Sequence, residues 1–242
     1  MRRGSDEQGA GDAPERVSRR PLLAIAHRAG NDLATFREAL DAGVDLVELD
    51  VHHARRALEV RHWKTLGPRL LWDRWELARR RDVDLPSLAV MLGALDGHAR
   101  LMIDLKGVHR GLAPAVAALL RETVPGLPVV VCTRHWWMLR AFAGDANVRL
   151  VPTVGGRRQL RTLVRLLRLR PVPWPGGRHA FAVCVRRALL TPSIVDELRR
   201  GAGRVLTWPV DTPADLEDAR RLGVTGVISK NLPLLREVVA DG

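Results

Sequence analysis

The chain has 242 residues, 46% of them hydrophobic, which is enough to bury the core of one larger α/β domain. Its 39 basic and 27 acidic residues leave a formal net charge of +12, so anionic partners such as phosphoesters, nucleic acid or a lipid surface are favoured over cationic ones. No apolar run approaches the roughly 18 to 20 residues that span a bilayer. Cys132 and Cys184 lie in apolar runs without metal-binding spacing, so we expect a cytoplasmic protein with reduced, buried cysteines rather than a disulfide.

Residues 1–20 are polar, rich in glycine and charge, and lack hydrophobic periodicity, so we expect a disordered leader. Over residues 21–242, strand-like apolar runs alternate with helix-like segments, which indicates a single domain. One linker, from Lys64 to Pro86, interrupts the alternation. The principal strands are predicted to begin at Pro21, Asp45, Ala99, Pro128, Val148, His179, Arg204 and Thr225.

About eight strand–helix units with apolar strands predict an α/β fold of the (β/α)₈ barrel type, with outer helices. A doubly wound open sheet is the alternative, but no glycine-rich dinucleotide fingerprint supports it. Residues that favour helix N-caps precede two of the predicted helices. Asp32 is a candidate N-cap for the first helix and Ser87 for the helix at residues 87–95.

Acidic residues recur with strand periodicity in two predicted strands. Residues two apart in a strand share a face, so Glu48 and Asp50 lie on the same side as His52. The same spacing pairs Asp104 with Lys106. Barrel interiors are normally filled by Val, Ile and Leu, so inward carboxylates require an explanation.

Glu48, Asp50 and Asp104 are predicted to converge near the carboxyl ends of the strands. Two unit charges about 4 Å apart repel by about 4 kcal/mol at an effective dielectric constant of about 20, so the cluster requires a cation. An oxygen-only ligand set favours Mg²⁺ or Ca²⁺ over Zn²⁺. Structural salt bridges to the abundant arginines are the alternative explanation.

Six short motifs, taken in their order along the chain, carry a resemblance to a known family. The motifs are His27-Arg28, Glu48-Leu49-Asp50, His62, IDLKG at 103–107, TWPVD at 207–211 and GVTGVISKNLP at 223–233. In this order they resemble the glycerophosphodiester phosphodiesterase family. The IDLK segment is also similar to the sphingomyelinase D and lysophospholipase D branch of the same barrel superfamily.

The resemblance implies a divalent-cation-dependent hydrolase of small phosphodiester substrates and assigns a role to each matching position. A pair of histidines suits this chemistry, because imidazole can both accept and donate a proton near neutral pH. By resemblance, the catalytic pair is His27 and His62, the metal ligands are Glu48, Asp50 and Asp104, and the phosphate or substrate contacts are Arg28, Lys106 and Trp208.

Several positions depart from the family pattern. The Pro-Glu-Asn-Thr signature after the first histidine is missing, and Asn31 or Asp32 could replace its glutamate. Trp63 stands where an aspartate usually follows the second histidine. Asp104 stands where glutamate is more usual, and the stretch between His62 and Asp104 is short. These changes leave the head group of the substrate open.

Two alternative functions remain open. One is a lysophospholipase D or sphingomyelinase D-like enzyme, in which the tryptophans at 63, 72 and 75 could form an apolar lip. The other is a catalytically weakened barrel that makes transient contact with an anionic membrane surface through the arginine-rich segment 157–170. That segment is equally typical of an outer barrel helix with its leucines inward. Only net charge favours nucleic acid, which we therefore do not expect as a partner.

Overall fold

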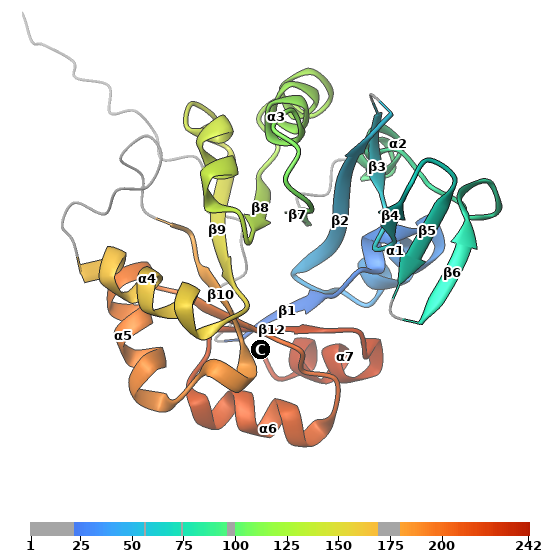
Figure 1. Cartoon of the computed structure of the whole chain (residues 1–242). Helices are drawn as coiled ribbons and strands as arrows, with labels where there is room; N and C mark the ends of the chain where they lie inside the picture. The colour runs from blue at the N-terminus through green and yellow to red at the C-terminus, as the bar shows by residue number, and fades with distance from the viewer. Residues whose placement is uncertain (1–21, 56, 74, 96–99, 169–179) are drawn as a thin grey trace, which may run out of the picture.

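The computed structural model describes residues 22–55, 57–73, 75–95, 100–168 and 180–242. Eight parallel strands form a closed barrel, because β1 pairs with both β2 and β12 (Figure 1). The predicted (β/α)₈ barrel is confirmed. The expected leader and the predicted strand starts at Pro21, Ala99 and His179 lie outside the described residues. In order around the barrel, the strands are β1 (Leu23–Ala26), β2 (Leu46–Ala54), β7 (Leu101–Leu105), β8 (Val129–Thr133), β9 (Val148–Val154), β10 (Val183–Arg186), β11 (Val205–Trp208) and β12 (Gly226–Ser229).

Helices surround the barrel, and their predicted caps are present. Asp32 accepts hydrogen bonds from the backbone of Ala34 and Thr35, and Ser87 accepts one from Val90. The α-helices are α1 (Leu33–Asp41), α2 (Leu88–Gly93), α3 (Leu112–Thr123), α4 (Arg157–Arg168), α5 (Pro192–Ala202), α6 (Pro213–Leu222) and α7 (Leu232–Ala240). Short 3₁₀ helices are η1 (Ala29–Asn31), η2 (Arg80–Asp82), η3 (Trp136–Phe142) and η5 (Arg187–Leu189).

The core has two layers, as the alternation of residues in the strands predicts. Val47, Leu49 and Val51 of β2 belong to the layer between the barrel and the helices. The barrel interior is filled by a smaller apolar cluster that includes the two buried, free cysteines. The acidic residues of β2 share the inward face with this smaller cluster.

The predicted linker at Lys64–Pro86 contains a second sheet. After β3 (Ala57–Val60) pairs with the end of β2, the chain forms three short antiparallel strands, β4 (Lys64–Leu66), β5 (Leu70–Asp73) and β6 (Glu76–Arg79). We call β4–β6 the insert sheet; it lies to one side of the barrel (Figure 1). Strands of three or four residues, interrupted by turns, leave too little alternation to be recognised from the sequence.

Residues 157–168 of the arginine-rich segment form an outer barrel helix, α4. Leu160, Leu163 and Leu167 are buried, while the arginines at 157, 158, 161, 165 and 168 are exposed. Arg168 forms an ion pair with Glu197 of the neighbouring helix α5. The apolar face of α4 is therefore already covered by the protein. None of the described helices has the length and hydropathy that crossing a membrane requires.

Candidate functional site

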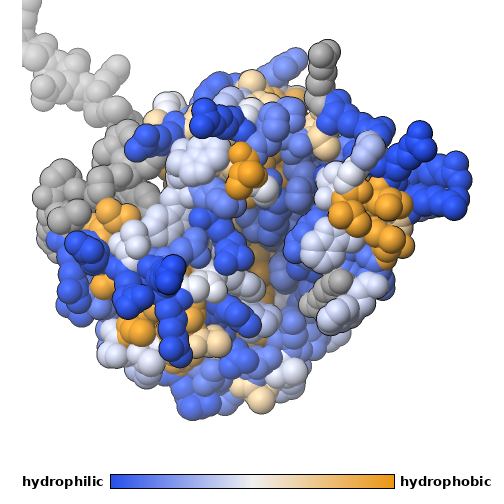
Figure 2. All heavy atoms as spheres, viewed as in Figure 1, coloured by the Kyte–Doolittle hydropathy of each residue, from blue (hydrophilic) through white to orange (hydrophobic). Residues whose placement is uncertain are grey.

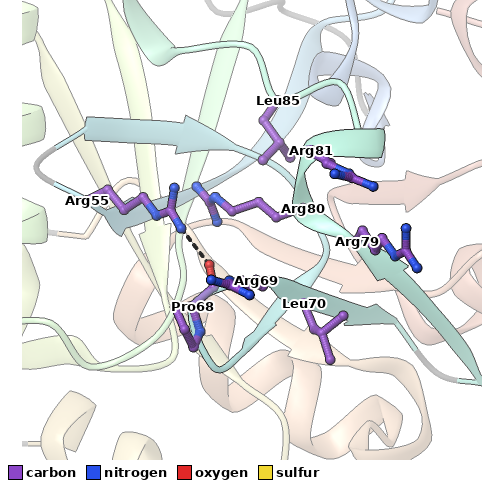
Figure 3. A pocket seen from close by; sticks show the side chains of 8 residues that line it. All are labelled: Arg55, Pro68, Arg69, Leu70, Arg79, Arg80, Arg81 and Leu85. Carbon is purple, nitrogen blue, oxygen red and sulfur yellow. Dashed lines mark hydrogen bonds between the residues drawn. The ribbon is translucent and has the colours of Figure 1, made fainter.

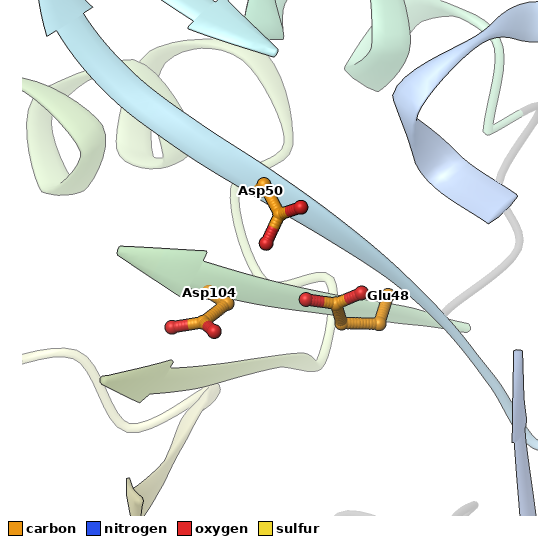
Figure 4. Close-up of side chains that lie close together, drawn as sticks. All are labelled: Glu48, Asp50 and Asp104. Atoms are coloured by element: carbon orange, nitrogen blue, oxygen red, sulfur yellow. The ribbon is translucent and has the colours of Figure 1, made fainter. Parts of the chain in front are cut away.

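Three carboxylates meet inside the barrel, as predicted. Asp50 of β2 lies directly opposite Asp104 of β7 in the parallel register, and Glu48 precedes Asp50 on the same face. One carboxylate oxygen from each of the three lies within 4.8 Å of the others. All three residues are buried, and their carboxyl groups point toward a common space (Figure 4).

Lys106, which follows β7, brings one positive charge to this cluster. Its Nζ lies 2.7 Å from Asp50 Oδ1 and also pairs with Asp104 Oδ2. Burial alone would raise the pKa of Asp50, but Lys106 and Asn31 outweigh it and lower this pKa to about 2. Burial would lower the pKa of Lys106, yet the surrounding carboxylates raise it well above its usual value. The Asp50–Lys106 pair is therefore ionised.

The other two carboxyl groups hold their protons more tightly than usual, because ionising them would leave the cluster with excess negative charge. Burial and then the Asp50 carboxylate raise the pKa of Glu48 well above its usual value. Burial also raises the pKa of Asp104, and Asp50 adds to the effect. One ammonium group does not balance three carboxylates, and a divalent cation would. The all-oxygen donor set at these positions fits a hard ion such as Mg²⁺ or Ca²⁺.

The segment after β1, which includes the η1 turn, forms hydrogen bonds to the acidic cluster. The Arg28 backbone, at φ 62°, donates a 2.6 Å hydrogen bond to Glu48 Oε2. Asn31 exchanges two hydrogen bonds with Asp50, through its side-chain amide and the Asp50 backbone N–H. A Cβ on Gly30 would lie 2.7 Å from Leu49 Cβ, so glycine permits this close approach. Of the two residues considered as replacements for the missing glutamate, Asn31 contacts the site, whereas Asp32 caps α1.

His27 follows β1 at the carboxyl end of the barrel. Its backbone N–H donates to Ser229 of β12, which fixes the position of the residue. Its Nδ1 is buried and has no hydrogen-bond partner among the described residues. Burial, followed by the positive charge of Arg28, lowers the pKa of His27 to about 3. The ring is therefore neutral near pH 7.

His62 is held by an acidic residue that the sequence did not reveal. Its Nδ1 lies 2.7 Å from Asp73 Oδ2, and Asp73 is the last residue of β5 in the insert sheet. Burial lowers the pKa of His62, whereas Asp50 and Asp73 raise it. The structure thus places Asp73 beside the His62 ring, although no aspartate follows His62 in the sequence.

The remaining predicted residues divide into two groups. Arg28 Nε lies 3.7 Å from Asp50 Oδ2, so its guanidinium group faces the acidic cluster. Trp208 ends β11 and packs against the apolar cluster inside the barrel.

A cavity of about 600 Å³ adjoins the cluster through Lys106. No carboxylate lines it, and the rings of His53 and His109 stack there with their centroids 4.0 Å apart. This surface suits an anionic or polar group next to the acidic cluster. Its lining residues are His52, His53, Arg61, Thr65, Lys106, Gly107, Val108, His109 and Arg110.

Solved structures share this architecture, although no protein-family model and no curated protein matches the sequence. A glycerophosphodiester phosphodiesterase from Parabacteroides distasonis is 16% identical, with a TM-score of 0.70, over 93% of this chain and 99% of that one. An Oleispira antarctica phosphodiesterase in complex with the product sn-glycerol-3-phosphate is 15% identical, with a TM-score of 0.67, over 91% and 97%. A Thermotoga maritima glycerophosphodiester phosphodiesterase is 16% identical, with a TM-score of 0.65, over 91% and 99%.

The chain has the fold of the glycerophosphodiester phosphodiesterases. At these identities the likeness establishes the fold, and the chemistry of the site depends on the residues of this chain. Within this glycerophosphodiester phosphodiesterase fold, the carboxylates, Lys106 and Arg28 are brought together at the carboxyl ends of the strands.

Replacing Asp73 with Asn should lower the pKa of His62 further, because both the hydrogen bond and the charge of Asp73 raise it. NMR titration of the His62 ring measures this change directly. Asp82→Asn is the matched control, since Asp82 is an exposed aspartate beside the insert sheet. An unchanged His62 pKa in Asp73→Asn would show that Asp73 does not act on His62.

Replacing Glu48 with Gln should alter how stability depends on pH. Because the folded-state pKa of Glu48 is raised, the folded protein retains a proton that the unfolded chain releases, and stability falls as the pH rises above 4.5. In the presence of a chelator, the unfolding midpoint of Glu48→Gln should fall less steeply with rising pH than that of the wild type. Glu38→Gln, on the exposed side of α1, should behave as the wild type.

The same Glu48→Gln variant also tests cation binding without reference to activity. A bound cation at 100 times its Kd stabilises a protein by about 2.7 kcal/mol, or roughly 5 to 10 °C in a chain of this size. Mg²⁺ or Ca²⁺ should raise the melting temperature of the wild type and have a much smaller effect on Glu48→Gln. Equal shifts in the two proteins would place the cation elsewhere.

Proposed function

We propose that this protein is a divalent-cation-dependent phosphodiesterase that hydrolyses glycerophosphodiesters to glycerol phosphate and an alcohol. The observation that carries this proposal is the buried carboxylate cluster with Lys106 and Arg28 against it. The fold shared with glycerophosphodiester phosphodiesterases supports the reaction class. The sn-glycerol-3-phosphate bound by the Oleispira antarctica neighbour supports the glycerol phosphate side of the substrate.

Glu48, Asp50 and Asp104 would hold the cation, which when bound stabilises negative charge on the phosphoryl oxygens. Lys106 and Arg28 orient the phosphate group by adding two further positive charges at the edge of the cluster. Lys106 presents a compact ammonium group, whereas the Arg28 guanidinium can donate two parallel hydrogen bonds to a phosphate. The cavity beside Lys106 would receive one of the two alcohol portions of the diester.

The surroundings of the two histidines suit different roles in proton transfer. The His27 ring is neutral near pH 7, which a group that accepts the proton of the attacking oxygen must be. Burial holds the pKa of His62 below its usual value, and Asp73 at its Nδ1 opposes this shift by favouring a proton on that nitrogen and stabilising the charged ring. His62 is therefore suited to donate a proton from Nε2 to the departing alkoxide.

A lysophospholipase D activity is the second candidate, and the insert sheet favours it. Leu66 and Leu77 are exposed apolar residues on the same sheet as Asp73, the partner of His62. An acyl chain could lie along this surface. Comparing turnover of glycerophosphocholine and lysophosphatidylcholine distinguishes the two activities. The binding-only alternative has lost its main support, because the leucines of α4 are buried.

His27→Ala and His62→Ala should each lower turnover by roughly 10² to 10⁴-fold, the range for losing one acid–base group. The assay uses glycerophosphocholine, glycerophosphoethanolamine, glycerophosphoinositol and lysophospholipids, each with and without a chelator. Arg161→Ala, on the exposed side of α4, should retain full activity. Unfolding midpoints of all variants provide the control for folding.

Chelation should abolish the activity of the wild type, and added Mg²⁺ or Ca²⁺ should restore it. Turnover at the wild-type rate in either histidine variant would refute the acid–base roles. Hydrolysis that persists in the chelator would refute the cation dependence while leaving the substrate class intact.

A further inference from the structure

The insert sheet presents one face that the rest of the described structure does not cover. Its antiparallel register places Lys64, Trp72 and Leu77 side by side on this face. Leu66 and Leu77 are 51% and 61% exposed, and Trp75, at the β5–β6 turn, is 98% exposed. Leu71, on the opposite face, is fully buried. The sheet thus has a buried side and an outward apolar side, seen as a group of apolar residues in Figure 2.

Exposed large apolar residues are concentrated here. Six such residues occur in the described part of the chain, and three of them lie in the insert sheet or its turn. The other three are dispersed, with Val90 on α2, Trp137 on η3 and Val108 between β7 and α3. Single exposed apolar residues need no explanation, but a cluster on one small sheet indicates an interaction surface.

Five arginines line a cavity of about 780 Å³ that borders this face (Figure 3). No carboxylate lines the cavity, although Glu59 pairs with Arg80 and the exposed Asp82 lies 3.5 Å from Arg81. Among the described residues, Arg69 and Arg79 form no ion pair. The lining residues are Arg55, Pro68, Arg69, Leu70, Arg79, Arg80, Arg81 and Leu85.

The cavity and the apolar face form one continuous surface. Leu70 and Arg79 both line the cavity, and they are paired partners across β5 and β6. Burial and then the positive charge of the nearby Arg55 lower the pKa of Arg80, as repulsion between these two arginines would. Phosphate groups would relieve this repulsion, because guanidinium matches the geometry of phosphate oxygens.

We propose that the insert sheet is a docking surface for an anionic phospholipid bilayer. Trp75, Leu66 and Leu77 enter the interfacial region, where tryptophan is favoured, and the arginine cavity binds lipid phosphates. Juxtaposed apolar and basic residues of this kind give binding through both burial and charge. The surface differs from α4, whose apolar side faces the protein.

Docking in this orientation brings the bilayer close to the candidate active site. Asp73, which holds His62, lies on the central strand of the insert sheet. The proposal does not depend on hydrolysis, because binding to vesicles can be measured without turnover. A failure of docking would leave the proposed phosphodiesterase activity standing. Likewise, a lack of phosphodiesterase activity would leave the proposed docking surface standing.

Vesicle flotation with the full-length protein tests docking. The vesicles contain phosphatidylcholine alone or an equal mixture of phosphatidylcholine and phosphatidylglycerol, and a chelator excludes bridging by cations. We expect binding to the mixed vesicles only. Arg69→Gln combined with Arg79→Gln should weaken binding by roughly 25-fold, because each basic residue near the surface contributes about fivefold.

Trp75→Ala should also weaken binding, with the unfolding midpoint and the hydrolysis of soluble diesters unchanged. The matched control is Arg161→Gln with Arg165→Gln, which removes the same charge from the exposed side of α4. This control should bind as the wild type does.

Three results would overturn the proposal. The first is equal loss of binding in the α4 control, which would indicate adsorption through net charge alone. The second is unchanged binding in both insert-sheet variants. The third is displacement by inorganic phosphate but not by sodium chloride of equal ionic strength, which would identify the cavity as a site for a small anion.

Discussion

The contact between the Lys106 ammonium and the carboxylates of Asp50 and Asp104 is the constraint on which the site depends. Burying charged groups is costly unless they are paired and hydrogen-bonded. The surrounding elements supply these partners, since the η1 turn binds Glu48 through a backbone N–H and Asp50 through Asn31. The raised pKa values of Glu48 and Asp104 indicate that ionising all three carboxyl groups is unfavourable in the isolated protein, and a divalent cation would stabilise the ionised form.

The insert sheet contacts the candidate site through Asp73 and also carries exposed residues on the surface of the protein. Asp73 reaches His62 from one end of β5, while the neighbouring strands carry exposed apolar residues and the arginine cavity. A small sheet therefore serves both to position a proposed catalytic histidine and to form a proposed lipid-binding surface. Changes in this sheet that affect activity need to be separated from changes that affect docking.

Strand periodicity was sufficient to predict the barrel and the inward direction of its acidic residues. Glu48 and Asp50 alternate with Val47 and Leu49. Because β2 is a regular strand, alternate residues of the sequence lie on opposite faces of the sheet in the structure. The Asp73–His62 contact could not be predicted, because it joins residues across short strands that carry no periodic signal. Similarly, the contact between Asn31 and Asp50 depends on the path of the η1 turn, for which the sequence offered two candidate residues.

The most direct test of the central claim is to soak crystals of the protein in Mn²⁺ and measure anomalous diffraction. A bound ion should give a peak at roughly 2.0 to 2.6 Å from carboxylate oxygens, the range for hard divalent ions. We predict that peak between Glu48, Asp50 and Asp104. The absence of a peak there, with Lys106 still paired to Asp50 and Asp104 at high Mn²⁺ concentration, would contradict a cation site and leave the cluster as a structural ion pair.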